Sequence, residues 1–267
     1  MIFLKKYNIR EKICETSHSV IYKAYFPNKD NVVTIKFEKT NNSTYLLNET
    51  KIRKYLQGTF GISPLIDFGL HQSKRYIVYP YVETTLHKKQ FNDQQLYECG
   101  HQLLTLIQSI HKKGVVHCDI SSTNILYSSI QNKYYYNDFG QSQHFNYVIT
   151  KNNKETLKGS PLFCSSHVHE GLDYTPRDDL ISIGFVLLYC YLGTLMWEGI
   201  KTCKSIYEKK QELRNNFWNE NIPHTLKIYL NYCFHLGINE TPKYEILIKI
   251  FAEKLTHVSS KQLAIGT

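Results

Sequence analysis

Residues 117–124, with the sequence HCDISSTN, carry side chains that can move a proton and hold a metal ion. Asp119 offers a carboxylate that can accept the proton of a hydroxyl, and Asn124, five residues later, offers a carboxamide oxygen to a cation. His117 stands two residues before Asp119. A His-x-Asp group in a loop is often only a turn, so this stretch indicates chemistry only if partners exist elsewhere in the chain.

Partners suited to phosphoryl transfer occur in order along the chain. That reaction needs a phosphoryl group held in line while a lysine and a metal ion neutralise its charge. Lys36 lies in the strand-like segment VVTIK, and Glu49 follows thirteen residues later in a segment with helical spacing. We expect Lys36, held by Glu49, to grip phosphates and Asp119 to act as the base. Asn124 and Asp138, the latter in NDFG, are the expected magnesium ligands.

Two kinds of segment would have to position these residues. Before residue 85, β-branched and aromatic residues predict strands at 19–26, 31–39 and 75–83, and one helix at 44–58 that ends at Gly58. After Leu86, helical spacing predicts helices at 93–114, 180–197, 224–237 and 244–255, with a loop at 160–176. We expect an α+β fold with a small β-rich lobe, a hinge near 80–86 and a larger helical lobe. The expected boundaries of this single domain, 1–267, are 1–82 for the N-lobe, 83–258 for the C-lobe and 259–267 for a short tail.

Several stretches carry a resemblance to a known family. NETKIRKYLQGTFGISPLIDFG is similar to that family's helix C and following turn, and GSPLFCSSHVHEGLDYTPRDDLISIGFVLLYCYLGTLMWEGIK to the end of its activation segment and its central helix. YLNYC near 229 and TPKYEILIKIF near 241 extend the match. The family is casein kinase I, in the branch of the protein kinases that includes the vaccinia-related kinases. It replaces the usual A-P-E with a Ser-Ile-Asn-like triplet, which here reads Ser165, Ser166 and His167.

The resemblance covers about residues 7–255 and implies a bilobal serine/threonine protein kinase that uses ATP and Mg²⁺. Tyr79 stands at the gatekeeper position behind the adenine pocket, and Pro80 and Val82 stand at the hinge, where a carbonyl and an N–H would meet adenine. Proline is tolerated there because only its carbonyl is needed. Leu126 would form the pocket floor, and Asp179 matches the residue that caps the catalytic-loop backbone. The residues that the resemblance assigns to the nucleotide are Ile13, Thr16, Ser19, Ile21, Thr34, Lys36, Tyr79, Pro80, Val82, Leu126 and Asp138.

The glycine-rich loop is the first departure from the family pattern. G-x-G-x-x-G falls on CETSHS, where Cys14, Thr16 and Ser19 occupy the glycine positions. Glycines let the backbone approach phosphates closely, so we expect looser or slower nucleotide binding.

Ser121 is the second departure, because Ser/Thr kinases usually carry a lysine there that neutralises the γ-phosphate. Losing one such donor costs about 10²–10³ in rate, and total accelerations are at least about 8 kcal/mol. The exchange should therefore slow a kinase rather than abolish its activity. Ser122, Ser160 and Lys158 are candidates to offset part of the loss.

Two further departures concern regulation and substrate. Cys118 replaces the Arg that pairs with an activation-loop phosphate, which indicates activity that does not depend on that phosphorylation, and we expect Cys118 to be a packed small side chain. The family's RRDD reads Pro176 and Arg177 before its two aspartates. One basic contact to acidic or phosphorylated protein substrates is thus missing, and Lys201 and Lys204 are the candidates to replace it.

The composition limits the other functions. The chain has 267 residues, 42% of them hydrophobic and 21% charged, with a net charge of +9 from basic residues spread along the sequence, so nucleic-acid binding is not expected as the main function. Its seven cysteines contain no C-x-x-C pair, which argues against a disulfide framework or zinc site and for an intracellular, cytoplasmic or nuclear, location. The N-terminal apolar run is too short for a signal peptide. The uncharged stretch 180–197 is interrupted by Ser182 and two glycines, so we expect a buried helix and no membrane partner.

Three functions stay open on the sequence alone. The leading one is an active Ser/Thr protein kinase of the casein kinase I type. A pseudokinase that binds or scaffolds other proteins is the second, favoured by the altered glycine loop and by Ser121 but opposed by the five intact residues named above. A small-molecule phosphotransferase is the third, and the protein-kinase-like stretch around RDDLISIG counts against it. The sequence does not indicate an oligomeric state.

Overall fold

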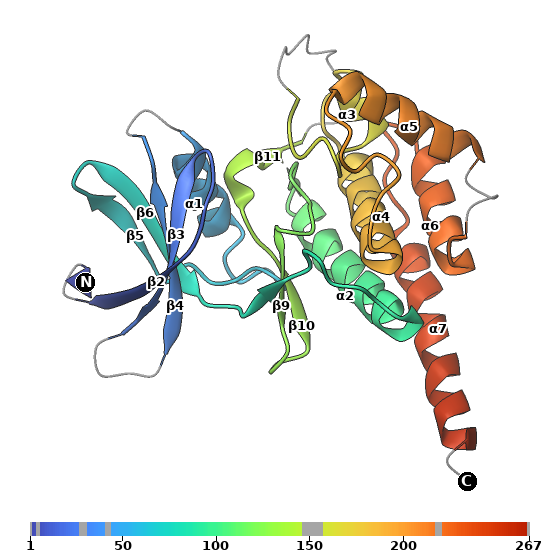
Figure 1. Cartoon of the computed structure of the whole chain (residues 1–267), viewed down its shortest axis with the longest axis horizontal. Helices are drawn as coiled ribbons and strands as arrows, with labels where there is room; N and C mark the ends of the chain where they lie inside the picture. The colour runs from blue at the N-terminus through green and yellow to red at the C-terminus, as the bar shows by residue number, and fades with distance from the viewer. Residues whose placement is uncertain are drawn as a thin grey trace.

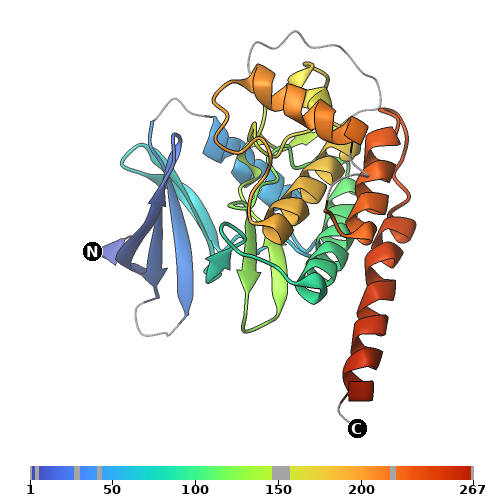
Figure 2. The same ribbon diagram turned by 45° about the vertical axis from the view of Figure 1, so that its right-hand side comes forward.

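The chain folds into two lobes joined by short strands, which Figures 1 and 2 show from two directions. This computed structural model describes residues 2–3, 6–26, 31–40, 44–145, 157–216 and 221–265. The smaller lobe is a sheet with one helix beside it, and the larger lobe is mostly helical. The expected α+β bilobal fold is therefore confirmed.

The small lobe is built on a six-stranded antiparallel sheet in the order β1-β2-β3-β4-β6-β5. β-branched and aromatic side chains favour these strands because they pack well on a pleated surface. Lys36 lies on β4 in the interior of the sheet, opposite Ile21 of β3 and Ile77 of β6. The strands are β1 (Ile2–Phe3), β2 (Tyr7–Glu15), β3 (Ser19–Tyr25), β4 (Val32–Glu38), β5 (Asp67–His71) and β6 (Lys74–Pro80).

Helix α1 (Tyr45–Tyr55) carries Glu49 and packs on the sheet through Leu46. The sequence predicted its end at Gly58, but Leu56 is the C-cap, and Gly58 follows with a left-handed φ of +78°. The reason is local: the N–H of Gln57 bonds to the carbonyl three residues back, which tightens the last turn before the glycine is reached.

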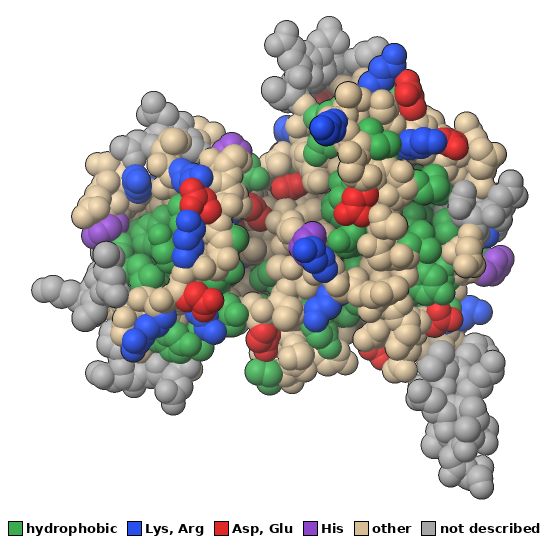
Figure 3. Space-filling view, in the orientation of Figure 1, with side chains coloured by type: hydrophobic (Ala, Val, Ile, Leu, Met, Phe, Trp, Pro, Cys, Tyr) green, Lys and Arg blue, Asp and Glu red, His purple; other side chains and the backbone are tan. Residues whose placement is uncertain are grey.

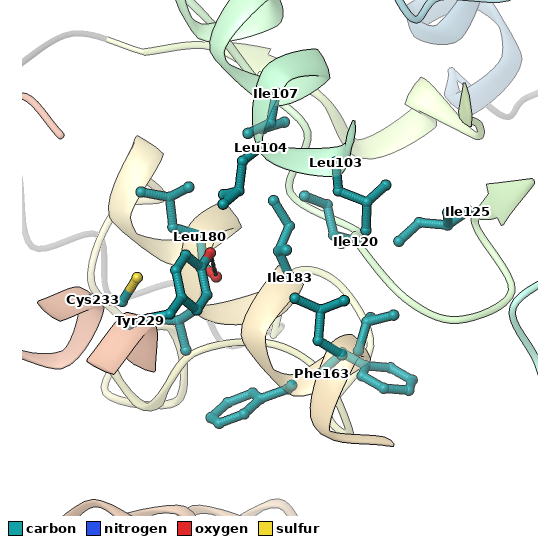
Figure 4. Close-up of a cluster of buried hydrophobic side chains, with 14 of the residues drawn as sticks. Leu103, Leu104, Ile107, Ile120, Ile125, Phe163, Leu180, Ile183, Tyr229 and Cys233 are labelled. Carbon is teal, nitrogen blue, oxygen red and sulfur yellow. Dashed lines mark hydrogen bonds between the residues drawn. The ribbon is translucent and has the colours of Figure 1, made fainter. Parts of the chain in front are cut away.

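The helical lobe surrounds a large apolar core. In Figure 4, Leu104 and Ile107 of α2, Leu180 and Ile183 of α4, and Tyr229 of α6 point toward one another, and a dashed line marks the 2.7 Å bond from the Tyr229 hydroxyl to the carbonyl of Leu180. The helices are α2 (Asp93–His111), α3 (Ser166–His169), α4 (Pro176–Leu192), α5 (Cys203–Asn216), α6 (His224–His235) and α7 (Tyr244–Ile265). The sequence predicted neither α5 nor the short α3, which lies in the expected loop 160–176.

Helix α4 contains residues 180–192 of the uncharged segment and runs through the centre of this lobe. Its residues 176–190 are all buried, as expected, but the helix begins four residues earlier and ends five residues earlier than predicted. Pro176 at its first position and a capping box between Thr175 and Asp178 set the start, while Gly193 with φ +82° sets the end. None of the helices within the described residues is long and apolar enough to cross a bilayer.

Short antiparallel pairs form the seam between the lobes. β9 (Ile125–Ser128) pairs with β7 (Thr84–Thr85) and β10 (Lys133–Tyr136), and β8 (Val115–Val116) pairs with β11 (Gln143–His144). These pairs bracket the segment 117–124 and the one-turn helix η1 (Phe139–Gln141) that follows Asp138. They therefore hold the candidate catalytic residues at the junction of the lobes.

Helix α7 continues beyond residue 258, where the sequence analysis placed the start of a short tail. No change of secondary structure marks that boundary before residue 265, and residues 266–267 lie outside the described part.

Candidate active site

Three charged side chains meet across the seam. Lys36 Nζ lies 2.7 Å from Glu49 Oε2 and 2.9 Å from Asp138 Oδ2. Burial opposes the charge of Lys36, but the carboxylates of Asp138 and Glu49 raise its pKa above the ordinary value. Burial also opposes the charge of Asp138, and Lys36 outweighs it and holds the pKa of that carboxyl below its usual range. The structure thus brings a lysine of the sheet, a glutamate of α1 and an aspartate of the seam into one ion-paired group.

Asp119 is held in a fixed orientation by its neighbours. Asn124 Nδ2 donates to its carbonyl at 2.9 Å and to its Oδ2 at 3.0 Å, and the Ser160 N–H donates to its Oδ1 at 3.1 Å. Burial, and after it the charge of Asp138, raises the pKa of Asp119 to about 7. This carboxyl group can therefore bind or release a proton near neutral pH.

Asp179 of α4 caps the backbone of the loop that carries Asp119. Its Oδ2 accepts the N–H of His117 at 2.7 Å, and its Oδ1 accepts the N–H of Cys118 at 3.1 Å, so its predicted capping role is confirmed. Cys118 is fully buried against residues such as Cys164 and Tyr174, which confirms the expected packed side chain. Its φ of +65°, a strained value for a non-glycine residue, was not predicted.

Two adjoining cavities open at this seam, and both are lined by Thr123. The larger, of about 460 Å³, is lined by Asp119, Asn124, Asp138 and Thr16 together with residues of the 159–163 segment. The smaller, of about 300 Å³, is lined by six of the predicted nucleotide residues, namely Ile13, Ile21, Thr34, Tyr79, Val82 and Leu126. Figure 3 shows acidic side chains where the two lobes meet.

Four predicted residues line neither cavity. Lys36 and Glu49 are buried, and Lys36 is paired with Asp138 of the larger cavity; Ser19 begins β3, and Pro80 ends β6 opposite Val33. Tyr81, Glu83, Thr84, Thr85 and Asn137 line the smaller cavity as well, and the sequence analysis did not name them. Four of them lie in the hinge segment and Asn137 lies directly before Asp138, and these positions are the signal that could have identified them.

Asn124 and Asp138, the predicted magnesium ligands, both line the larger cavity. Asn124 turns its amide nitrogen toward Asp119, which leaves the carboxamide oxygen as its acceptor atom. One carboxylate and one carboxamide oxygen match the hard ligands of magnesium, which usually takes one or two protein ligands and completes its shell with water and substrate phosphates. Among the described residues, no group of three or more His, Cys, Asp or Glu side chains is placed to hold a metal ion.

A comparison with models of protein families identifies the family of this chain. The model of the protein kinase domain matches residues 7–261. The chain belongs to the protein kinase domain family.

Within that family, the chain is similar to casein kinase I. It is 28% identical to casein kinase I homolog 2 of Schizosaccharomyces pombe over 93% of this chain, and 27% identical to casein kinase I homolog 1 of the same yeast over 96%. Homolog 3 of that yeast is 26% identical over 95% of the chain. The chain spans 62–63% of the length of these curated relatives.

The loop that replaces the glycine-rich loop of this kinase domain is closed by its own hydroxyls. Thr16 Oγ1 accepts the N–H groups of His18 at 3.3 Å and Ser19 at 3.0 Å, and lies 3.0 Å from Ser19 Oγ. Backbone N–H groups of such loops are the usual donors to phosphates. In this kinase domain two of them are already engaged, which gives a physical reason for the expected weaker nucleotide binding.

Tyr45, at the start of α1, contacts several parts of the cleft that the sequence analysis did not connect. Its ring stacks on His18 with centroids 4.7 Å apart, and Lys36 Nζ lies 5.7 Å from its centre. Burial, followed by Asp138, raises its pKa, and a hydrogen bond from Gln141 partly opposes that rise. Gln141 also accepts the Gly159 N–H at 2.8 Å. Tyr45 thus links the loop tip to η1, although nothing in its local sequence marks this role.

The candidate substrate-facing basic residues differ in exposure. Arg177 is buried and lies 3.7 Å from Asp178, whereas Lys201 and Lys204 are exposed, and Lys204 lies 4.0 Å from Glu208. Lys158 donates to Gln143, while Ser121, Ser122 and Ser160 line the larger cavity. Lys and Arg side chains are scattered over both lobes on the face shown in Figure 3 rather than gathered in one patch.

Proposed function

We propose that this kinase domain transfers the γ-phosphate of ATP to serine and threonine hydroxyls of proteins. The observation that carries the proposal is the position of Lys36 Nζ, 2.7 Å from Glu49 and 2.9 Å from Asp138, because Asp138 lines the larger cavity together with Asp119 and Asn124. This is the arrangement that phosphoryl transfer needs, with cationic and acidic groups fixed before the substrate arrives.

Each residue then has one role. Lys36, kept in place by Glu49, binds the α- and β-phosphates, and Asp119 orients the attacking hydroxyl and accepts its proton. Adenine occupies the smaller cavity, with Tyr79 at its back and Leu126 as its floor. Its amino edge meets the backbone of the hinge at 80–82.

Asn124 and Asp138 would hold magnesium, which neutralises the charge of the phosphates when it is bound. The Asp138 carboxylate is suited to this because Lys36 keeps it ionised. Asn124 is suited because its bond to Asp119 fixes its carboxamide.

We further propose that activity does not depend on phosphorylation of the activation segment. Cys118 is buried in an apolar cluster and offers no cation to a phosphate. The loop is instead fixed through Asp179, whose bonds to its backbone need no modification.

The substrates we propose are acidic or already phosphorylated proteins, with the exposed Lys201 and Lys204 as contacts. All seven cysteines are free thiols, which supports an intracellular, cytoplasmic or nuclear, site of action.

The test compares wild type with Asp119→Asn in magnesium, ATP and casein. We expect the variant to lose at least about 10³-fold in phosphate transfer while its ATP affinity stays within about threefold, because the base acts on the substrate hydroxyl. Asp93→Asn, which removes a carboxylate from the first turn of α2, is the matched control and should keep the wild-type rate.

The alternative function is that of a pseudokinase scaffold, which the engaged N–H groups at Thr16 favour. Wild type that binds ATP but transfers no more phosphate than Asp119→Asn, on casein and on several basic and acidic peptides, would establish that alternative. Wild type that binds no ATP would do so as well.

A further inference from the structure

An arginine, Arg53, is buried in the small lobe near Lys36, the residue that we propose binds the phosphates. It is therefore a second buried cation with no role in our account of nucleotide binding. Arg53 lies on α1, one helical turn after Glu49, and its side chain has no exposed surface. A buried charge is costly unless it is paired and hydrogen-bonded. The partners of Arg53 therefore show what holds it there.

The guanidinium group binds three different segments. Its Nε donates to Glu49 Oε1 at 2.9 Å, its Nη2 to Asn137 Oδ1 at 2.6 Å, and its Nη1 to the carbonyl of Ser63 at 3.4 Å. The planar fork of arginine suits such divergent acceptors better than the single ammonium of lysine. Arg53 thus connects α1, the loop after it and the residue directly before Asp138.

The charges form a balanced chain. Each oxygen of the Glu49 carboxylate binds one cation, Oε1 binding Arg53 and Oε2 binding Lys36, and Lys36 in turn binds Asp138. Two cations and two carboxylates alternate, three of them with at most 2% of the side chain exposed. Without Arg53, the buried group would carry a net negative charge and Glu49 would have an unpaired oxygen.

Asn137 extends this chain to the catalytic loop. Its carbonyl lies 3.0 Å from His117 Nε2, and its N–H donates to the carbonyl of Asn124 at 2.9 Å. The guanidinium also lies over the rings of Tyr79, at 4.7 Å, and Phe139, at 5.2 Å. The segment 137–139 is thereby held from α1 by one side chain.

We propose that Arg53 is a positioning residue that keeps α1 and the Asp138 segment in the arrangement competent for phosphoryl transfer, without a phosphate on the chain. The inference rests on the proposed function and adds how the site stays assembled although Cys118 supplies no cation. Arg53 itself lines neither cavity, although two of the residues it contacts, Asn137 and Tyr79, line the smaller one. It acts through Glu49 and Asn137.

A purely structural role makes a different prediction. If Arg53 only neutralised Glu49 inside the lobe, then its bond to Asn137 would have no effect on phosphate transfer. Two variants separate these roles. Asn137→Ala keeps the Arg53–Glu49 pair and removes the tie to Asp138, and Arg53→Lys keeps the charge but loses the fork.

The experiment measures kcat on casein, the thermal unfolding midpoint, and ATP affinity with and without magnesium. Asn137→Ala and Arg53→Lys should lower kcat by about 10- to 100-fold, since a shift near 1 Å at a reacting group costs about that much. ATP affinity without magnesium should stay within about threefold in Arg53→Lys, which alters no cavity-lining residue. In both variants the gain in ATP affinity from magnesium should shrink at least about fivefold, because Asp138 is the displaced group. Arg53→Met should lower kcat further than Arg53→Lys. Arg75→Met, which removes an arginine paired with Glu38 at 3.0 Å on the same lobe, should keep kcat within about twofold.

Wild-type kcat in both Asn137→Ala and Arg53→Lys would overturn the inference while leaving the proposed function intact, even if Arg53→Met fails to fold. If wild type binds ATP but transfers no phosphate, the proposed function fails. In that case the gain in ATP affinity from magnesium decides the inference. The inference stands if Asn137→Ala removes this gain and is overturned if Asn137→Ala leaves it unchanged. Wild type that binds no ATP would overturn both.

Discussion

Gly140, in the one-turn helix after Asp138, is the position where a single added methyl group should disturb the site most directly. A Cβ built on Gly140 would lie 1.8 Å from Tyr45 Cε1 and 2.2 Å from Cδ1. Ordinary contacts begin near 3.4 Å. In Gly140→Ala the helix η1 and the Tyr45 ring would therefore have to separate by roughly 1.6 Å, the difference between an ordinary contact of 3.4 Å and the 1.8 Å to Cε1.

That movement reaches the catalytic group because the Gly140 N–H bonds to Asp138 Oδ1 at 3.3 Å, and Asp138 Oδ2 lies 2.9 Å from Lys36. A displacement above 1 Å at a charged group that positions substrate costs about 10²-fold in rate. We expect Gly140→Ala to lower kcat by about 10²-fold and the free energy of unfolding by about 1–3 kcal/mol. Steady-state phosphate transfer to casein and urea unfolding measure the two effects.

The cause is tested by a double-mutant cycle with Tyr45→Ala, which removes the ring that the new methyl group would meet. The double variant should recover most of the kcat lost by Gly140→Ala, measured relative to Tyr45→Ala alone. Gly237→Ala, where the added Cβ makes only an ordinary 3.5 Å contact, is the control and should change neither quantity. Additive losses in the double variant, or wild-type kcat in Gly140→Ala, would refute the reasoning.

Three further outcomes are expected. Ser121→Lys should raise kcat by about 10²-fold, since one donor to the transferred group contributes about 10²–10³, and a rate at or below that of wild type contradicts our account of position 121. Burial lowers the pKa of His117, and burial together with Lys210 lowers that of His169 to about 4. An unfolded histidine titrates near 6.5, so each of these two side chains binds more protons in the unfolded chain between about pH 6.5 and 4 and contributes less stability as the pH is lowered. Asp119, with its raised pKa, acts in the opposite direction, so the effect is measured as a difference: by urea unfolding at fixed salt, the free energy of unfolding of wild type should fall relative to that of His169→Gln as the pH is lowered through that window. Gly100→Ala places a Cβ 2.5 Å from the Phe251 ring and should lower the free energy of unfolding by about 1–3 kcal/mol in urea titrations, with an unchanged KM for ATP.

The sequence was sufficient to predict the residues that meet at the seam, because their order and local context are readable along the chain. Lys36 falls in an alternating strand and Glu49 in a helical segment, and both local patterns are present in the structure. Asp138 was identified through the stretch NDFG. The cap from Asp179 was found in the same way, through the motif at the start of the buried helix.

Arg53 was not found, because its ion pair with Glu49 is local but its bond to Asn137 is a long-range contact. In the sequence KIRK it looks like its neighbour Lys54, which is exposed with its ammonium 3.9 Å from the Phe68 ring, whereas Arg53 is buried. The two residues are adjacent on the helix, so one faces the sheet and the seam and the other faces solvent. The bond that ties Arg53 to the seam goes to Asn137, 84 residues away, and a contact at that separation cannot be read from the local sequence.

The backbone φ values bear on the choice between an active kinase and a pseudokinase scaffold. Cys118 and Asp138 both have left-handed φ values, +65° and +59°, which cost about 1–3 kcal/mol each in non-glycine residues. Each is held by specific bonds, Cys118 by Asp179 and Asp138 by Lys36, and a Cβ at Gly159 would lie 2.5 Å from the carbonyl of Cys118. A scaffold that needs only the bilobal shape gains nothing from either strained residue. Left-handed φ values also occur at Gln72, Ser73, Lys88 and Asn132, none of which lines either nucleotide cavity. What favours phosphoryl transfer is therefore the combination at Cys118 and Asp138 of a left-handed φ with specific bonds that hold a proposed catalytic group or its neighbour.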